Sequence, residues 1–137
     1  MHKYHTQIFL HQTDAAGRLF FACQFYLMHE ALEKLNESVG LPIQAMLGYP
    51  GMTFPLVHAE SDYDSILVAG DRIIVEVGVE KIGNTSVAFA YRIKKEDGTL
   101  VGSGKTVSVC VDIKTQKKIP VPKEWREKYS KALIHPH

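Results

Sequence analysis

An acidic residue in a turn before a helix is the first feature of this sequence that could do chemistry. Asp14 stands in the stretch "HQTDAAGRLFFACQFYLMHEALEKL", which runs from His11 to Leu35. Small residues after Asp14 predict a turn, and the apolar run that follows predicts a helix beginning near Ala22. A helix directs unpaired backbone N–H groups, and about half a positive charge, towards the turn before it. An oxygen that gains negative charge there would be stabilised, as in an oxyanion hole.

The carboxylate of Asp14 itself has two interpretations. Beside such a site it could attack a carbonyl carbon, or activate a water molecule that attacks it. Asp is also a common turn residue, because its side chain accepts hydrogen bonds from its own backbone. Residue type and spacing alone favour the turn interpretation, since an acid before a helix is frequent in proteins.

Histidines provide the next candidates. His58, in "FPLVHAES", stands among apolar residues of an expected strand, where an imidazole requires a polar partner. It could orient a substrate, carry a proton or pair with an acid such as Glu60 or Asp14, and a purely structural histidine fits equally well. His11 and His29 could approach the turn around Asp14. The histidines expected at the surface or terminus, without a role, are His5, His135 and His137.

Several motifs that would indicate other chemistries are missing from the sequence. It contains no glycine-rich phosphate loop after a strand, no paired-cysteine zinc spacing and no G-x-S-x-G elbow. His11 and Asp14 lie close together in sequence, but no third or fourth metal ligand is evident, so neither a metal site nor a cofactor is expected. Cys23 and Cys110 are expected to be free, buried thiols.

Length and composition restrict the class of protein. The 137 residues fit a single domain spanning 1–137, and the formal net charge of +1 argues against nucleic-acid binding. No stretch approaches the roughly 20 apolar residues that span a bilayer, so no membrane partner is expected. The first residues, "MHKYHTQ", lack the apolar core of a signal peptide, which makes a cytoplasmic location the expectation.

A helix and a set of strands must position these side chains. The region from Tyr4 to His11 is expected to form a first strand. In the helix that follows Asp14, apolar residues recur at helical spacing, and Gly40 is expected to end it. These apolar residues are Phe25, Leu27, Met28, Ala31, Leu32, Leu35 and Val39.

The rest of the chain predicts mainly strands. A short helical turn is expected around 43–47, strands within 54–66, 71–83, 85–98 and 99–113, and a C-terminal helix at about 122–133. In the last strand the residues in phase are Val107, Val109, Val111 and Ile113, while Gly102 and Gly104 indicate a bulge or the close approach of another element. Together these elements predict an α+β fold, in which a strongly curved antiparallel sheet wraps around one helix. The open edge of such a sheet favours a dimer.

The stretch "TDAAGRLFFACQFYLMHEAL" closely resembles the front signature of the 4-hydroxybenzoyl-CoA thioesterase-like family of hotdog-fold proteins. The likeness includes the Thr13-Asp14 pair, the turn 15–17 and the aromatic pair Phe20-Phe21. Two later stretches, "FPLVHAESDYDSILVAGDRIIVEV" and "DGTLVGSGKTVSVCVDIKTQKKIPVP", are similar to the family's later strands and its closing hairpin. The resemblance covers about residues 4–125.

This resemblance implies a hotdog fold, in which a five-stranded antiparallel sheet wraps one long helix, and an acyl-CoA thioesterase. It implies that Asp14 is the catalytic nucleophile or general base, and that the backbone N–H of Phe21 polarises the thioester carbonyl. Gly17, Phe20 and His58 are assigned to substrate binding. It further implies a homodimer, or a dimer of dimers, with active sites at the subunit interface.

Within the family, the sequence looks most like the 1,4-dihydroxy-2-naphthoyl-CoA thioesterases of quinone biosynthesis, on "DAAG", "HEA" and "FPLVHAE". Relatives that act on other acyl-CoAs often carry histidine at the position of Phe21, and its absence fits an aromatic acyl pocket. Two alternatives remain open: a hotdog dehydratase or hydratase, and a non-catalytic module that binds acyl thioesters. Basic residues that could meet the CoA phosphates, with none singled out, are Arg92, Lys105 and Lys114.

Overall fold

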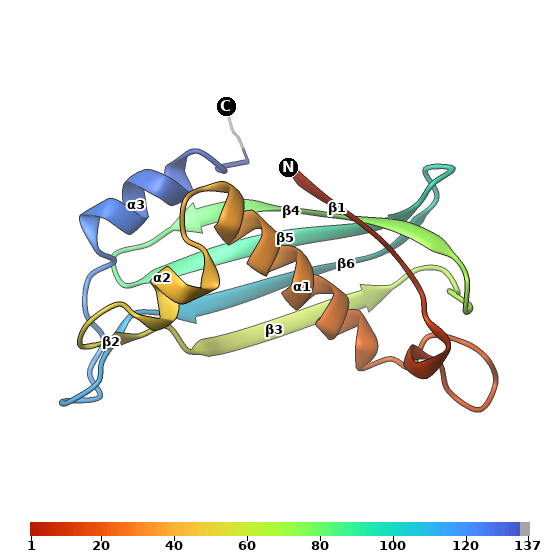
Figure 1. The fold of residues 1–137 in the computed structure, drawn as a ribbon, viewed down its shortest axis with the longest axis horizontal. Coiled ribbons are helices and arrows are strands. Elements are labelled where there is room, and N and C mark those ends of the chain that lie inside the picture. Colours follow the sequence, from red (N-terminus) through yellow and green to blue (C-terminus); the bar gives the residue numbers. More distant parts are fainter. Residues whose placement is uncertain (135–137) are drawn as a thin grey trace.

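The computed structural model describes residues 1–134, so the expectations for His135 and His137 fall outside it. Five antiparallel strands form one sheet in the order β1-β4-β5-β6-β3, and α1 packs across one face of that sheet (Figure 1). The expected α+β hotdog arrangement is therefore confirmed. The elements are β1 (His2–Gln7), a 3₁₀ turn (Leu10–Gln12), α1 (Cys23–Ser38), α2 (Ile43–Leu47), β2 (Met52–Thr53), β3 (Leu56–Tyr63), β4 (Arg72–Ile82), β5 (Ser86–Lys95), β6 (Leu100–Val109), β7 (Val111–Asp112) and α3 (Lys123–Ser130).

The core lies between α1 and the two central strands, and it follows the expected periodicities. Alternate residues of β4 and β5 point into the core and are at most 2% exposed: Ile73, Val75, Val77, Val79, Val87, Phe89, Tyr91 and Ile93. The facing stripe of α1 is equally buried at Leu27, Met28, Ala31 and Leu35. Complete burial of one such side chain contributes about 1.5–3 kcal/mol. After α1, Gly40 adopts a φ of +91°, which suits glycine at a helix C-terminus and confirms the expected stop.

The buried face of β6 differs from the expectation. The set in phase at 107–113 does not form it as a whole: Val109 is 4% exposed, but Val107 is only half-buried and Ile113 is 47% exposed. The residues that face α1 are instead Gly102, Gly104, Thr106 and Ser108. A Cβ on Gly102 would lie 2.5 Å from the carbonyl oxygen of Asp62 and 2.6 Å from the Nε2 of Gln24. The helix therefore approaches β6 too closely for valine, which confirms the expected close approach at the glycines.

The first strand and the C-terminal helix are both shorter than the sequence predicts. The first strand ends at Gln7 rather than His11, because residues 10–12 turn and the Gln12 Oε1 accepts the Phe9 N–H at 2.8 Å. The C-terminal helix covers 123–130, where Trp125 and Tyr129 are buried. Leu133 lies beyond it and is 45% exposed.

Two further expectations concern the thiols and the membrane. Both cysteines are free; Cys110 is buried and Cys23 is half-buried. Burial raises the pKa of the Cys110 thiol to about 11, which keeps it protonated and unreactive at neutral pH. None of the helices within residues 1–134 is both long and apolar enough to cross a membrane.

Candidate active site

The Asp14 side chain is exposed and closes its own turn. Its Oδ1 accepts the backbone N–H groups of Ala16 at 2.9 Å and Arg18 at 3.2 Å. Gly17 completes the turn with a φ of +75°, a conformation that L side chains rarely adopt. The turn interpretation thus accounts for one carboxylate oxygen. Within the described residues, Oδ2 accepts no hydrogen bond and is the oxygen available for chemistry.

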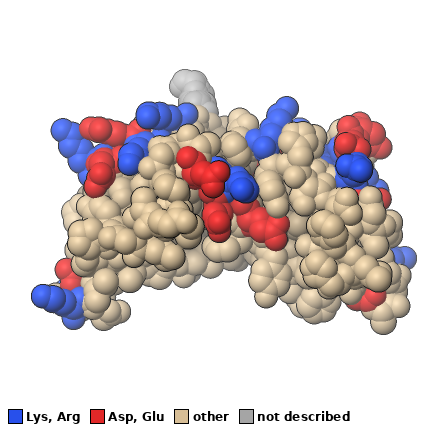
Figure 2. Space-filling view, viewed as in Figure 1, with Lys and Arg blue, Asp and Glu red and all other residues tan. Residues whose placement is uncertain are grey.

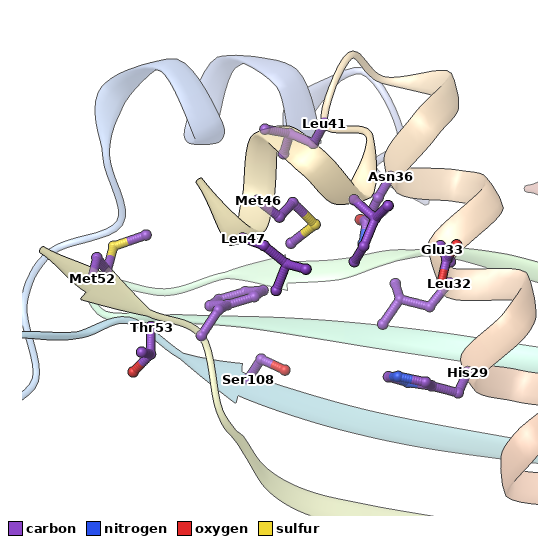
Figure 3. A pocket seen from close by; sticks show the side chains of 12 residues that line it. His29, Leu32, Glu33, Asn36, Leu41, Met46, Leu47, Met52, Thr53 and Ser108 are labelled. Atoms are coloured by element: carbon purple, nitrogen blue, oxygen red, sulfur yellow. The ribbon is translucent and has the colours of Figure 1, made fainter. Parts of the chain in front are cut away.

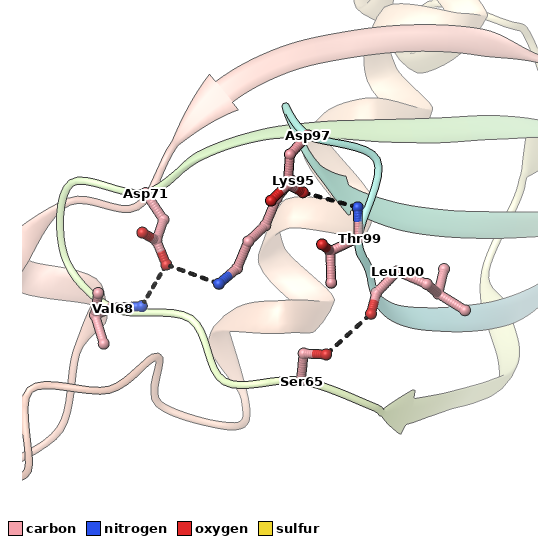
Figure 4. Close-up of polar contacts among 7 residues, drawn as sticks. All are labelled: Ser65, Val68, Asp71, Lys95, Asp97, Thr99 and Leu100. Atoms are coloured by element: carbon pink, nitrogen blue, oxygen red, sulfur yellow. Dashed lines mark hydrogen bonds and ion pairs between the residues drawn. The ribbon is translucent and has the colours of Figure 1, made fainter.

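Asp14 also lines a cavity of about 190 Å³ whose wall is held in place. The wall residues 65–67 precede the turn into β4, and the Leu19 N–H donates to the Leu67 carbonyl at 2.8 Å. Figure 4 shows how this segment is fixed: the Asp71 carboxylate accepts the Val68 N–H at 2.9 Å and lies 3.9 Å from the Lys95 Nζ. The Ser65 hydroxyl donates to the Leu100 carbonyl at 3.1 Å (Figure 4).

Two backbone donors directly before α1 are unpaired. The N–H of Cys23 reaches the Phe20 carbonyl at 2.8 Å, and the N–H of Gln24 reaches the Phe21 carbonyl at 3.3 Å. The N–H groups of Phe21 and Ala22 donate to no acceptor in the described part of the chain, and no side chain caps this helix end. These donors and the helix dipole favour an oxygen that carries negative charge.

β3 anchors this helix start through two side chains that the sequence did not single out. The Tyr63 hydroxyl donates to the Phe21 carbonyl at 2.8 Å. The Gln24 side chain, 1% exposed, donates from Nε2 to the Ser61 Oγ at 2.7 Å and to the Asp62 carbonyl at 2.9 Å. Both Gln24 and Tyr63 line the Asp14 cavity. The period of two along β3, which puts Ser61 and Tyr63 on one face, is the signal that could have found Tyr63.

Two further cavities run along α1 beyond this site. One of about 350 Å³ begins at Ala22 and is lined mostly by apolar and aromatic side chains of α1 and β3. Its polar floor is the buried pair Tyr91 and Thr106, whose hydroxyl oxygens lie 2.8 Å apart. The other, of about 300 Å³, lies between α1, α2 and β2, and Figure 3 shows His29 and Ser108 at one side of it. His29 lines both cavities.

Comparison with known proteins decides which family this arrangement belongs to. The sequence profile of the thioesterase-like superfamily matches residues 9–129. The chain belongs to this superfamily. It is 30% identical over 124 residues to the 1,4-dihydroxy-2-naphthoyl-CoA hydrolase of Synechocystis sp., with 90% of each chain covered. The corresponding hydrolase of Nostoc punctiforme is 28% identical over 127 residues, which cover 90% of this chain and 85% of that one.

Solved structures agree with membership of the superfamily. The crystal structure of the Synechocystis 1,4-dihydroxy-2-naphthoyl-CoA thioesterase matches with a TM-score of 0.88 over 98% of both chains, at 30% identity. A gentisyl-coenzyme A thioesterase matches in fold, with a TM-score of 0.82 at 22% identity, over 94% of this chain and 99% of that one. The expectation of a thioester hydrolase on a hotdog fold is confirmed at the level of the family.

Among the residues that the resemblance to thioesterases singled out, His58 lies apart from the others. Its Nε2 is 2.7 Å from the Glu60 Oε1, and both side chains are more than half exposed, at 52% and 58%. Leu56 and Ala59 line the cavity under α1, and a register shift between Leu56 and His58 reverses the alternation. His58 therefore points to the opposite face of the sheet. Within a single chain, His58 therefore does not lie near Asp14. A substrate-binding role for His58 stays a prediction.

The remaining candidates lie as follows. The rings of Phe20 and Phe21, 44% and 64% exposed, pack against each other with centroids 4.8 Å apart. His11 stacks on Phe9 at 5.9 Å and does not line the Asp14 cavity. The Lys105 Nζ lies 2.9 Å from the Glu80 Oε1, and this pairing raises the pKa of Lys105. The candidate site that one chain assembles is thus Asp14, its cavity and the start of α1.

Proposed function

We propose that this thioesterase hydrolyses an acyl-CoA thioester to the free acid and CoA, and that its acyl group is aromatic, of the 1,4-dihydroxy-2-naphthoyl kind. One observation carries the proposal: a carboxylate with an unpaired oxygen lines the same cavity as Gln24, in the first turn of a helix whose start has two unpaired N–H donors. The names of the relatives at about 30% identity support the class of substrate.

The chemistry divides between the carboxylate and the helix start. The N–H of Phe21 binds the thioester carbonyl oxygen and stabilises the charge that develops on it; removing one such donor typically costs about 10²–10³-fold in kcat. The Asp14 carboxylate either attacks the carbonyl carbon or takes a proton from an attacking water. In the first case a mixed anhydride forms, CoA leaves as the thiolate, and water then hydrolyses the anhydride. In the second the acid and CoA are released directly.

The cavity that begins at Ala22 is the proposed acyl site. Its lining is mainly apolar and aromatic, with Phe25 and Tyr26 near the helix start and Leu56 at the far end of β3. His29 and the hydroxyls of Tyr91 and Thr106 are polar groups of this lining that could bind a ring substituent. Such a mixture suits a hydroxylated aromatic acid better than a fully aliphatic chain.

A thiol-release assay across a panel of acyl-CoAs tests this function. We expect kcat/KM for 1,4-dihydroxy-2-naphthoyl-CoA and 4-hydroxybenzoyl-CoA to exceed that for acetyl-CoA and palmitoyl-CoA by about tenfold or more. Ligand binding without release of CoA from any thioester would contradict the proposal and indicate a binding module. Addition of water to an enoyl thioester without free thiol would indicate a hydratase. The absence of histidine from the described lining of the Asp14 cavity disfavours a hydratase.

We also propose a homodimer that forms along β3, or a dimer of such dimers. β3 is an edge strand, and seven of its eight residues are exposed, with Leu56 at 50% and Val57 at 58%. Figure 2 shows few charged side chains along the middle of the lower margin, where β3 lies in Figure 1. A second copy that pairs with this edge would satisfy its backbone groups and cover the apolar side chains.

Sedimentation equilibrium at micromolar concentration checks the assembly. We expect a mass of two or four times the 15.4 kDa of one chain. A mass of one chain at every concentration tested would contradict the proposed dimer, and would leave His58 without a route to the reacting group.

A further inference from the structure

The last residue of β3 contacts the backbone of the helix start directly. The Tyr63 hydroxyl donates to the Phe21 carbonyl at 2.8 Å, and the same oxygen accepts the Gln24 N–H at 3.3 Å. This carbonyl and the N–H of Ala22 belong to a single planar peptide group, in which they point in opposite directions. A contact that fixes the oxygen therefore fixes the direction of the Ala22 N–H.

The peptide that Tyr63 contacts links the two cavities through its neighbours. Ala22 lines the proposed acyl cavity, whereas Tyr63 lines the Asp14 cavity. Within residues 1–134 the Ala22 N–H donates to no acceptor. A hydrogen bond to the carbonyl of a peptide also polarises the group and strengthens its N–H as a donor.

A buried side chain gives independent evidence that a hydrogen-bonding molecule belongs here. The Asp62 carbonyl can only accept, so the atom of Gln24 that contacts it must be the amide nitrogen. The amide oxygen of Gln24 is then left without a donor in the described residues, on a side chain that is 1% exposed and lines the Asp14 cavity. Buried carbonyl oxygens are almost always hydrogen-bonded, so a donor such as the attacking water belongs in this cavity.

We propose that Tyr63 is a positioning residue for thioester hydrolysis. Its hydroxyl orients the peptide between Phe21 and Ala22, so that the Ala22 N–H is a second donor to the thioester oxygen beside the Phe21 N–H. The inference rests on the proposed function, since it assigns a role within that reaction.

Tyr63→Phe tests this role, because it removes the hydroxyl and keeps the ring. We expect kcat to fall about tenfold or more, since a misplaced donor stabilises the transition state poorly, while KM changes less than about twofold. Tyr4→Phe is the matched control. The Tyr4 hydroxyl donates to the Glu30 Oε1 at 2.8 Å, so this variant also removes a tyrosine hydrogen bond between a strand and α1, away from the helix start. We expect its kcat to equal that of the unmodified protein.

A ¹H–¹⁵N correlation spectrum reports the orientation of the Phe21–Ala22 peptide independently of turnover. In Tyr63→Phe the amide proton signal of Ala22 is expected to move upfield, and in Tyr4→Phe it is expected to stay in place. An unmoved Ala22 signal, a rise in KM alone, or an equal fall of kcat in both variants would overturn the inference. If no thioester is turned over, the proposed function and this catalytic role fall together, while the signal still reports whether Tyr63 orients the peptide.

Discussion

Asp14→Asn is expected to lower kcat by about 10³-fold or more, with the fold and the Tm unchanged. The asparagine amide oxygen can still accept the N–H groups of Ala16 and Arg18, so the turn survives. What disappears is the negative charge, and with it the nucleophile or base. The substitution therefore separates the two interpretations of Asp14, because a residue that only closes a turn would tolerate it.

Asp14→Ala supplies the complementary control. Alanine loses both hydrogen bonds to the turn as well as the charge, so we expect the same loss of kcat together with a lower Tm. Undiminished turnover by Asp14→Asn would contradict the catalytic role of Asp14. Rapid-quench mass spectrometry of the unmodified protein distinguishes the two mechanisms, since only a nucleophilic Asp14 forms a chain that is heavier by the acyl group.

Gly102→Val is expected to lower the free energy of unfolding by about 3 kcal/mol, through overpacking beneath α1. Strand propensity alone predicts the opposite, since valine favours strands over glycine. The new Cβ would meet the Asp62 carbonyl oxygen at 2.5 Å and the Gln24 Nε2 at 2.6 Å. The first of these atoms belongs to the backbone of β3 and cannot rotate away. β3 must shift at Asp62 and the Gln24 amide must leave its place, which disturbs the anchor of the α1 start, so kcat is expected to fall as well.

Ser103→Val is the matched control for the glycine variant. Ser103 is the next residue of β6 and points to the opposite face of the sheet, where α1 does not pack. We expect its free energy of unfolding, measured with urea, to change by less than about 1 kcal/mol. A Gly102→Val protein as stable as the unmodified chain would contradict the close approach of α1 to β6.

Those parts of the fold that depend on local pattern were predictable from sequence. β4 and β5 bury alternate residues because each faces the core along its whole length. Gly40 ends α1 because glycine readily adopts the positive φ that is needed there. The face of β6 was not predictable, since the valines at 107 and 109 fit strand periodicity. The distance to α1 decided that face instead, and this distance is a property of the assembled fold.

The candidate site divides in the same way. The turn around Asp14 and the unpaired donors of the helix start follow from neighbouring residues. The contacts of Tyr63 and Gln24 join residues about 40 positions apart, a separation that local patterns do not encode. His58 was expected in the site, but a bulge after Leu56 turns it to the other face, and residues 54–63 contain no glycine that would indicate this bulge.

Polar side chains anchor α1 at both of its ends. Tyr63 and Gln24 hold its first turn, and the Tyr129 hydroxyl holds Asn36 near its last turn at 2.8 Å. Between these polar anchors, the helix lines the two cavities with both apolar and polar side chains, among them Phe25, Met28 and His29. On the proposed mechanism, bond cleavage and choice of acyl group depend on different stretches of one helix. Substitutions in the middle can reshape the cavities while the anchored end keeps its donors, which allows new substrates to evolve on unchanged reaction machinery.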